Sequence, residues 1–212
     1  MRRRAWLVVL LVCAAIPRVA DAHRSDEYLQ ATRISIESDR IAAEIILTPG
    51  AAVADNVFAG IDQDRNGEIS APEAAAYAEY VVKSLSLDID GHLHPLILDT
   101  YSMASLADMR HGEGIIRLRA SAKMPSAPAG RHRLTFANTH RSDIGVYLIN
   151  ALIPEDERIR ITGQSRDLLQ HEFKIDYVVS ERESGFGLAA ALPSILGLVL
   201  AAGFYAIARR FN

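Results

Sequence analysis

Residues 62–73 read Asp62-Gln-Asp-Arg-Asn-Gly-Glu-Ile-Ser-Ala-Pro-Glu73, and the stretch matches the twelve-residue calcium loop of an EF-hand. Ca²⁺ is a hard cation that takes about six to eight oxygen ligands, and the loop spacing supplies them. The expected ligands are Asp62, Asp64, Asn66, the Glu68 carbonyl, Ser70 and Glu73, the last as a bidentate carboxylate. The sequence therefore predicts a Ca²⁺ site, with an acidic surface turn that holds no metal as the alternative.

The segments on both sides of the loop have helical periodicity. Apolar residues recur before it at Val53, Val57, Phe58 and Ile61, and after it at Ala74, Tyr77, Ala78, Val81 and Leu85. Pro72 falls at the start of the second helix, where its missing N–H costs nothing. The pattern predicts an EF-hand helix-loop-helix over residues 51–86. Only one such loop occurs in the sequence, which favours a structural ion over a regulatory switch.

Outside this pair of helices, the apolar residues alternate with polar ones, as they do in strands. Ile34 and Ile36 alternate up to the turn at Ser38-Asp39, and residues 41–47 alternate back, which indicates a hairpin. Asp90-Gly91 predicts a tight turn that joins strands over residues 85–89 and 92–98. Further strands are expected at residues 114–122, 132–137, 145–152, 158–162 and 171–179. The fold class is therefore α+β, an antiparallel β-rich, sandwich-like domain that carries the helix-loop-helix as an insertion.

The first 22 residues have the three parts of a secretory signal peptide. Arg2, Arg3 and Arg4 precede an apolar run over residues 5–16, and Ala20-Asp21-Ala22 is a small-x-small cleavage site. The alternative, a short membrane anchor, needs a longer apolar run to cross a bilayer of about 30 Å. The only cysteine, Cys13, lies inside this segment, so a chain cleaved after Ala22 forms no disulfide.

A second hydrophobic segment stands near the C-terminus. Residues 185–208 are 24 consecutive residues without a charge, which as a helix reach about 36 Å. Arg209 and Arg210 begin the tail 209–212, and positive residues stay on the cytoplasmic side. We expect a single transmembrane helix with a cytoplasmic tail and an extracytoplasmic, periplasmic domain over residues 23–184. A buried core helix is the alternative for residues 185–208.

The charge balance of the chain after residue 22 argues against nucleic-acid binding. Residues 1–22 contain four of the 23 basic and one of the 26 acidic residues, so the remainder carries 19 basic and 25 acidic residues, a formal −6. No basic patch with interleaved aromatic residues occurs. The expected partner is the membrane itself.

The sequence offers little that is typical of an enzyme. It has no G-x-S-x-G elbow, no H-E-x-x-H pair and no phosphate-binding glycine loop. His140, Ser142 and Asp143 are residue types of a catalytic triad, but the short polar run that contains them is typical of a loop. We therefore expect no catalytic residues.

Histidines suggest a second metal chemistry. Cleavage after Ala22 would make His23 the N-terminus, where its amine and ring nitrogen together chelate a transition metal. His92 and His94 are two residues apart and would share a face if this segment is a strand. The alternative hypothesis is an accessory or metallochaperone protein for nickel, cobalt or copper.

Four stretches together resemble one known family. These are Ala22-His23, Thr48-Pro49-Gly50, the loop 62–73, and residues 85–96 with the pattern L-x-L-x-x-D-G-x-x-x-P-L. They resemble the extracytoplasmic N-terminal domain of some bacterial nickel/cobalt efflux-type membrane proteins, over roughly residues 22–137. Members of that family carry several membrane helices after this domain, whereas one is expected here, so transport is not implied. The resemblance implies a related exported domain that stands beside a separately encoded membrane protein.

Overall fold

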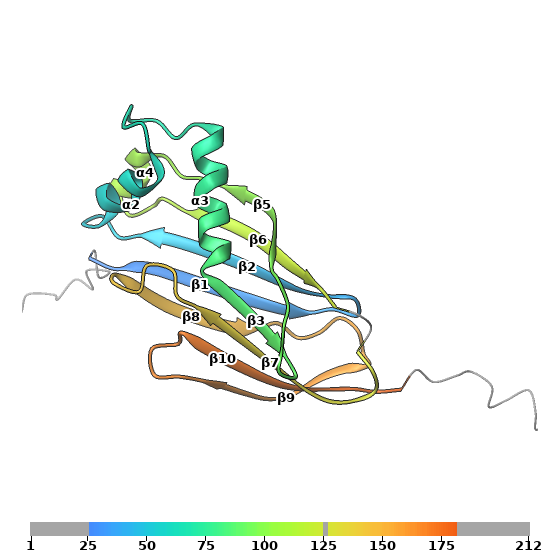
Figure 1. The fold of residues 1–212 in the computed structure, drawn as a ribbon. Helices are drawn as coiled ribbons and strands as arrows, with labels where there is room; N and C mark the ends of the chain where they lie inside the picture. The colour runs from blue at the N-terminus through green and yellow to red at the C-terminus, as the bar shows by residue number, and fades with distance from the viewer. Residues whose placement is uncertain (1–25, 125–126, 182–212) are drawn as a thin grey trace, which may run out of the picture. The chain divides into compact units, whose positions relative to one another are not determined.

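The computed structural model describes residues 26–124 and 127–181, and those up to Val179 form a β-rich unit (Figure 1). Its strands form two five-stranded sheets. The expected signal peptide, His23, the expected membrane span and the tail 209–212 lie outside the described residues. None of the helices within the described ranges combines the length and the apolar character that a membrane crossing requires.

The first sheet contains both strands of the N-terminal hairpin. Its strands, in spatial order, are β5 (Ile97–Ser102), β6 (Ile116–Lys123), β2 (Arg40–Pro49), β1 (Tyr28–Ile36) and β8 (Gly145–Ala151). Neighbours are antiparallel except β1 and β8, which run parallel with Tyr28 opposite Gly145. The parallel pair arises because the chain enters β8 from the other sheet, at the end where β1 begins.

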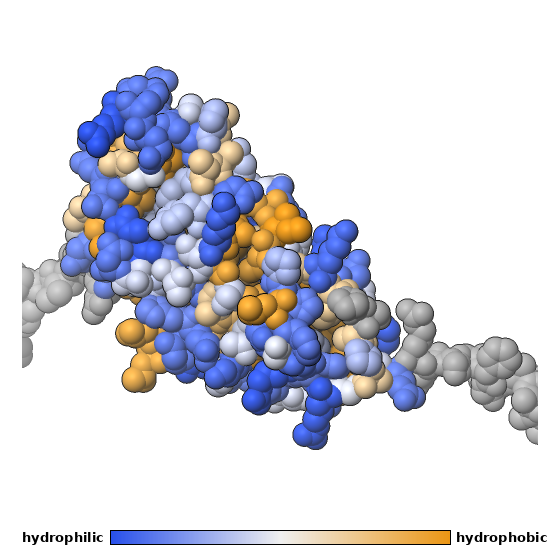
Figure 2. Space-filling view, in the orientation of Figure 1, coloured by the Kyte–Doolittle hydropathy of each residue, from blue (hydrophilic) through white to orange (hydrophobic). Residues whose placement is uncertain are grey.

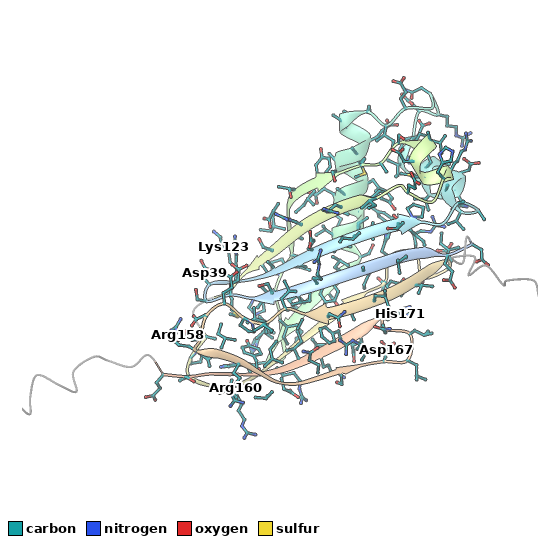
Figure 3. All side chains as sticks on the ribbon, turned by 180° about the vertical axis from the view of Figure 1, so that it is seen from behind. Asp39, Lys123, Arg158, Arg160, Asp167 and His171 are labelled. Atoms are coloured by element: carbon teal, nitrogen blue, oxygen red, sulfur yellow. The ribbon has the colours of Figure 1, made fainter. Side chains whose placement is uncertain are left out.

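The second sheet is antiparallel throughout. Its strands, in spatial order, are β4 (His92–Leu93), β3 (Leu85–Ile89), β7 (Gly130–Asn138), β10 (Glu172–Val179) and β9 (Ile159–Arg166). Figure 3 views the unit from behind, with Arg158 and Arg160 at the start of β9 and His171 just before β10. Arg158 and His171 therefore lie at opposite ends of the β9–β10 hairpin.

Alternating side chains of the two sheets form one hydrophobic core. Ile34, Ile45 and Leu118 of the first sheet are fully buried, and so are Phe136 and Phe173 of the second. All five belong to the same buried cluster. Burying an apolar side chain of this size stabilises the fold by about 1.5–3 kcal/mol. The expected antiparallel-dominated, β-rich architecture is thus confirmed.

Two helices lie between β2 and β3, within the segment where the sequence predicts them. They are α2 (Ala54–Ile61) and α3 (Ala71–Lys83), and α3 packs against β5. Phe58 and Val81 place the apolar faces of these helices in the core cluster. Figure 1 shows both helices at one end of the sheets. Figure 2 shows hydrophilic side chains over the loop that joins them, at the top of the view.

The segment after β3 differs from the prediction. The prediction of a returning strand over residues 92–98 is wrong. Strand β4 ends at Leu93, and the chain then crosses to the first sheet, where it forms β5. Pro95 lies at the crossing, where its missing N–H prevents a continuous ladder. A short helix that the sequence did not reveal, α4 (Leu106–Arg110), follows with Ser105 as its N-cap.

The loop between β7 and β8, residues 139–144, carries the chain from one sheet to the other. It does so at the helical end, the end of the two sheets at which α2 and α3 lie. It closes against Gly145, whose N–H donates to the Arg141 carbonyl (2.7 Å). A Cβ at Gly145 would come within 2.8 Å of three heavy atoms, the Arg141 carbonyl oxygen, Gln30 Nε2 and Tyr147 Oη. The close packing explains why a residue without a side chain stands here.

We expect Gly145→Ala to destabilise the fold by about 1–3 kcal/mol, because the added methyl group overpacks atoms that hydrogen bonds hold in place. Gly60→Ala is the control, since a Cβ there meets nothing within 4 Å. In helix α2 that change is expected to stabilise by about 0.5–1 kcal/mol. Urea unfolding followed by circular dichroism measures both. Equal urea midpoints for the two variants would contradict the close packing around Gly145.

Candidate metal centre

Three carboxylates of the predicted loop lie close together. Asp62, Asp64 and Glu73 offer ligand oxygens that are all within 4.8 Å of one another. Among residues 26–124 and 127–181, this is the group of three or more acidic, histidine or cysteine side chains that could share an ion. Asp62 follows α2 and is 5% exposed, whereas Glu73 stands in the first turn of α3.

The loop backbone is folded around the Asp62 carboxylate. Its Oδ1 accepts from Asn66 N (3.1 Å) and its Oδ2 from Gly67 N (2.9 Å). Gly67 has φ +88°, a left-handed conformation that glycine adopts without steric cost. The turn that the sequence predicts at Gly67 is therefore present, and it aims two N–H groups at the first acidic residue.

Glu73 closes the loop from the other side. Its Oε1 accepts from Gln63 N (2.6 Å) and Asp64 N (3.2 Å), and its Oε2 accepts from Ser70 N (2.9 Å) and Ser70 Oγ (2.6 Å). Hydrogen bonds from Ser70, supported by the other donors, lower the pKa of Glu73 to about 2. Glu73 is therefore ionised at neutral pH.

The other predicted ligands belong to the same loop but make hydrogen bonds within it. Asn66 Oδ1 accepts from Glu68 N (2.8 Å), and Asn66 Nδ2 donates to Asp64 Oδ2 (2.9 Å). Ser70 is the N-cap of α3 and forms a capping box with Glu73. The structure thus gathers the three carboxylates and places Asn66, Glu68 and Ser70 as supports around them.

Like charges so close repel one another. Two carboxylates 4.8 Å apart raise the free energy by about 1 kcal/mol in water and about 3 kcal/mol where the effective dielectric is near 20. A divalent cation between them removes this repulsion and supplies attraction instead. Oxygen donors alone suit Ca²⁺ or Mg²⁺.

The histidines of the alternative hypothesis are not assembled in the same way. His92 is exposed in β4, whereas His94 lies beyond that strand and is half-buried, so the two do not share a regular strand face. Neither belongs to the group of candidate metal ligands found in the described ranges. Other histidines make structural contacts: His132 Nδ1 pairs with Asp90 Oδ2 (2.7 Å), and His171 packs edge-on against Tyr147.

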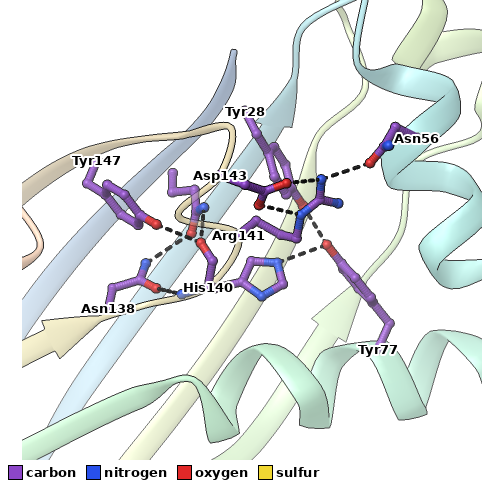
Figure 4. A network of polar contacts seen from close by, with 9 residues as sticks. Tyr28, Asn56, Tyr77, Asn138, His140, Arg141, Asp143 and Tyr147 are labelled. Atoms are coloured by element: carbon purple, nitrogen blue, oxygen red, sulfur yellow. Dashed lines mark hydrogen bonds and ion pairs between the residues drawn. The ribbon is translucent and has the colours of Figure 1, made fainter. Parts of the chain in front are cut away.

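A buried polar network beneath the two helices was not foreseen from the sequence (Figure 4). Tyr77 Oη of α3 lies 2.9 Å from Tyr28 Oη of β1 and 3.0 Å from His140 Nε2. His140 is 1% exposed, and among the described residues its Nδ1 has no hydrogen-bond partner. Burial, with the nearby Arg141 charge, lowers the pKa of His140 to about 4, and burial raises the pKa of Tyr77 to about 12.

The triad residue types do not form a triad. Asp143 pairs with Arg141 through two hydrogen bonds of 2.9 and 3.0 Å, and His140 faces tyrosine rings. The short polar run around His140 predicted a loop, and only contacts with tyrosines at distant positions make His140 a buried residue. A scan against known protein families finds no match for this chain, and a search of curated proteins finds no significant relative.

The buried, neutral His140 predicts a pH-dependent stability. Its folded-state pKa of about 4 lies below the ordinary 6.5, so an unfolded chain binds the proton first as the pH falls. The contribution is complete above about pH 6.5 and is lost toward pH 4, by about 2 kcal/mol between pH 7 and pH 5. We expect the difference in unfolding free energy between the parent and His140→Gln to shrink by that amount over this range. A difference that stays constant from pH 7 to pH 5 would contradict a neutral His140.

Proposed function

We propose that this protein is a membrane-anchored, extracytoplasmic Ca²⁺-binding module in which a single EF-hand loop holds a structural ion. The observation that carries the proposal is the gathering of Asp62, Asp64 and Glu73 in a loop whose sequence matches the EF-hand spacing. The coincidence of a twelve-residue pattern with clustered carboxylates supports Ca²⁺ over a solvated acidic turn.

The ion would act on the packing of α2 and α3. Asp62 directly follows α2 and Glu73 lies in the first turn of α3, so a cation that binds both ties the helices together across the loop. Binding to the folded state alone stabilises it by RT ln(1 + [Ca²⁺]/Kd). Extracellular modules of this kind bind at about 10⁻⁴ to 10⁻³ M, which suits a compartment rich in calcium.

The sequence supports the location. A signal-like segment precedes the domain, and residues 185–208 contain no charge before Arg209 and Arg210. The resemblance to the exported domain of nickel/cobalt efflux-type proteins adds a separately encoded membrane protein as the proposed partner. In this proposal the domain is a binding and interaction module without catalytic activity.

Calorimetric titration of the full chain with Ca²⁺ tests the proposal. We expect a calcium-dependent heat and a higher melting temperature at millimolar Ca²⁺, because the ion binds only the folded loop. Glu73→Gln and Asp62→Ala are expected to abolish both effects while the β signature in circular dichroism stays. Glu68→Gln is the matched control: it removes one negative charge from the same loop, but the expected ligand there is the backbone carbonyl.

A parent chain whose melting temperature ignores millimolar Ca²⁺ would remove the proposed function. Loss of binding in Glu68→Gln as large as in Glu73→Gln would show that general charge, rather than the predicted ligand set, attracts the ion.

The membrane anchor is tested separately by truncation. A chain ending at Ser184 lacks residues 185–212, and we expect it in the soluble extracytoplasmic fraction, whereas the full chain stays in the membrane pellet after alkaline extraction. The physical reason is that the 24 uncharged residues are long enough, as a helix, for a stable span. Release of the full chain by alkaline extraction would contradict the anchor.

A further inference from the structure

Three consecutive residues between β7 and β8 contact the helix pair. Thr139 reaches the C-terminal end of α3, His140 reaches the middle of α3, and Arg141 reaches α2. We call residues 139–144 the crossover loop, since they carry the chain between the two sheets. The helices that flank the candidate calcium loop are therefore both held by one short segment that lies outside them.

Arg141 connects the loop to α2. Its Nη2 donates to Asn56 Oδ1 (2.8 Å). The guanidinium is fixed by two hydrogen bonds to the Asp143 carboxylate, one from Nε (2.9 Å) and one from Nη2 (3.0 Å). Such a two-pronged pair holds the planar group in one orientation. The crossover loop therefore fixes the position of Asn56, and with it the helix α2 that Asp62 follows.

The contacts to α3 are of two kinds. Thr139 donates from both N and Oγ1 to the Ser84 carbonyl, each at 3.0 Å, and Ser84 is the C-cap of the helix. Tyr77 Oη lies 3.0 Å from His140 Nε2. Tyr77 stands one turn after Glu73, so this contact fixes the part of α3 that carries the last ligand.

The crossover loop is itself held by the sheets (Figure 4). The His140 carbonyl accepts from Gln30 Nε2 of β1 and from Tyr147 Oη of β8, each at 2.7 Å. Asn138, at the end of β7, accepts from His140 N (2.9 Å) and donates to Gln30 Oε1 (3.0 Å). Gln30, Asn138 and His140 are at most 3% exposed, so water does not compete for these bonds.

We propose that Arg141 and His140 are positioning residues of the candidate calcium site, which set its affinity by holding α2 and α3 at the separation that three carboxylates need. The inference rests on the proposed function. In an EF-hand that stands alone, no second loop fixes the two helices; here the β-sandwich does so through the crossover loop. An unrestrained helix pair loses conformational freedom when it closes around the ion, which weakens binding. Here that loss already occurs when the protein folds.

The test measures Ca²⁺ affinity of the folded full chain by calorimetry. Asn56→Ala removes the acceptor of Arg141 and Tyr77→Phe removes the hydroxyl that meets His140, while neither changes a predicted ligand. We expect each to raise the Kd about 3- to 10-fold, the effect of one lost hydrogen bond on the arrangement of the site. Asn56→Asp keeps an acceptor oxygen for Arg141 and is expected to bind within twofold of the parent, or more tightly.

Asn150→Ala is the matched control. Asn150 Oδ1 accepts from Arg166 Nη2 (2.9 Å), an exposed arginine–amide bond of the same kind that contacts neither helix. Its Kd is expected to stay within twofold of the parent. The melting temperature without calcium is recorded for every variant, so that a general loss of stability is separated from a loss of affinity.

The inference would be overturned if Asn56→Ala and Tyr77→Phe had the same Kd as the Asn150→Ala control, whatever their melting temperatures. The calcium site itself would remain in place. The parent titration reports on the proposed function independently. A parent without calcium-dependent heat removes that function, and the positioning role falls with it.

Discussion

The backbone carbonyl of His140 accepts hydrogen bonds from Gln30 and Tyr147, and these bonds anchor the crossover loop that contacts both helices. These donors belong to β1 and β8, the one parallel pair of the first sheet, so the carbonyl fixes the crossover loop at the point where the chain changes sheets. A buried carbonyl left without a donor would cost about 1–3 kcal/mol. The loop therefore has one favourable position, and the residues on either side of that carbonyl present their side chains to α2 and α3.

The carboxylates of the candidate centre illustrate an opposing constraint. Backbone N–H groups satisfy Asp62 and Glu73, yet the mutual repulsion of three negative groups within 4.8 Å remains. A loop that brings them together is stable because it is short, capped by Ser70, and attached to helices whose apolar faces lie in the core. Stability supplied by the core thus maintains an arrangement that, on electrostatic grounds alone, would open.

Local signals made the helix pair, the turn at Gly67 and most strands predictable, because periodicity and loop spacing depend on neighbouring residues. The crossing from β4 to β5 was missed, since the alternation around His92 and Leu96 does not reveal which sheet a strand joins. The role of His140 was missed for a related reason. Its burial depends on Tyr28 and Tyr77, which are 112 and 63 positions away in the sequence, and no local pattern reports such contacts. The placement of the carboxylates could be predicted because all three lie in one twelve-residue loop.

Apolar and polar contacts make different contributions at the helical end. Burial of Phe58 and Val81 drives α2 and α3 onto the sheets, but hydrophobic contact is non-directional and tolerates small shifts along a helix axis. Hydrogen bonds at Thr139, His140 and Arg141 accept only narrow ranges of distance and angle. A ring of oxygen donors around one ion requires positions accurate to a few tenths of an ångström. The hydrophobic core therefore accounts for the presence of the helices, and the polar crossover loop accounts for their spacing.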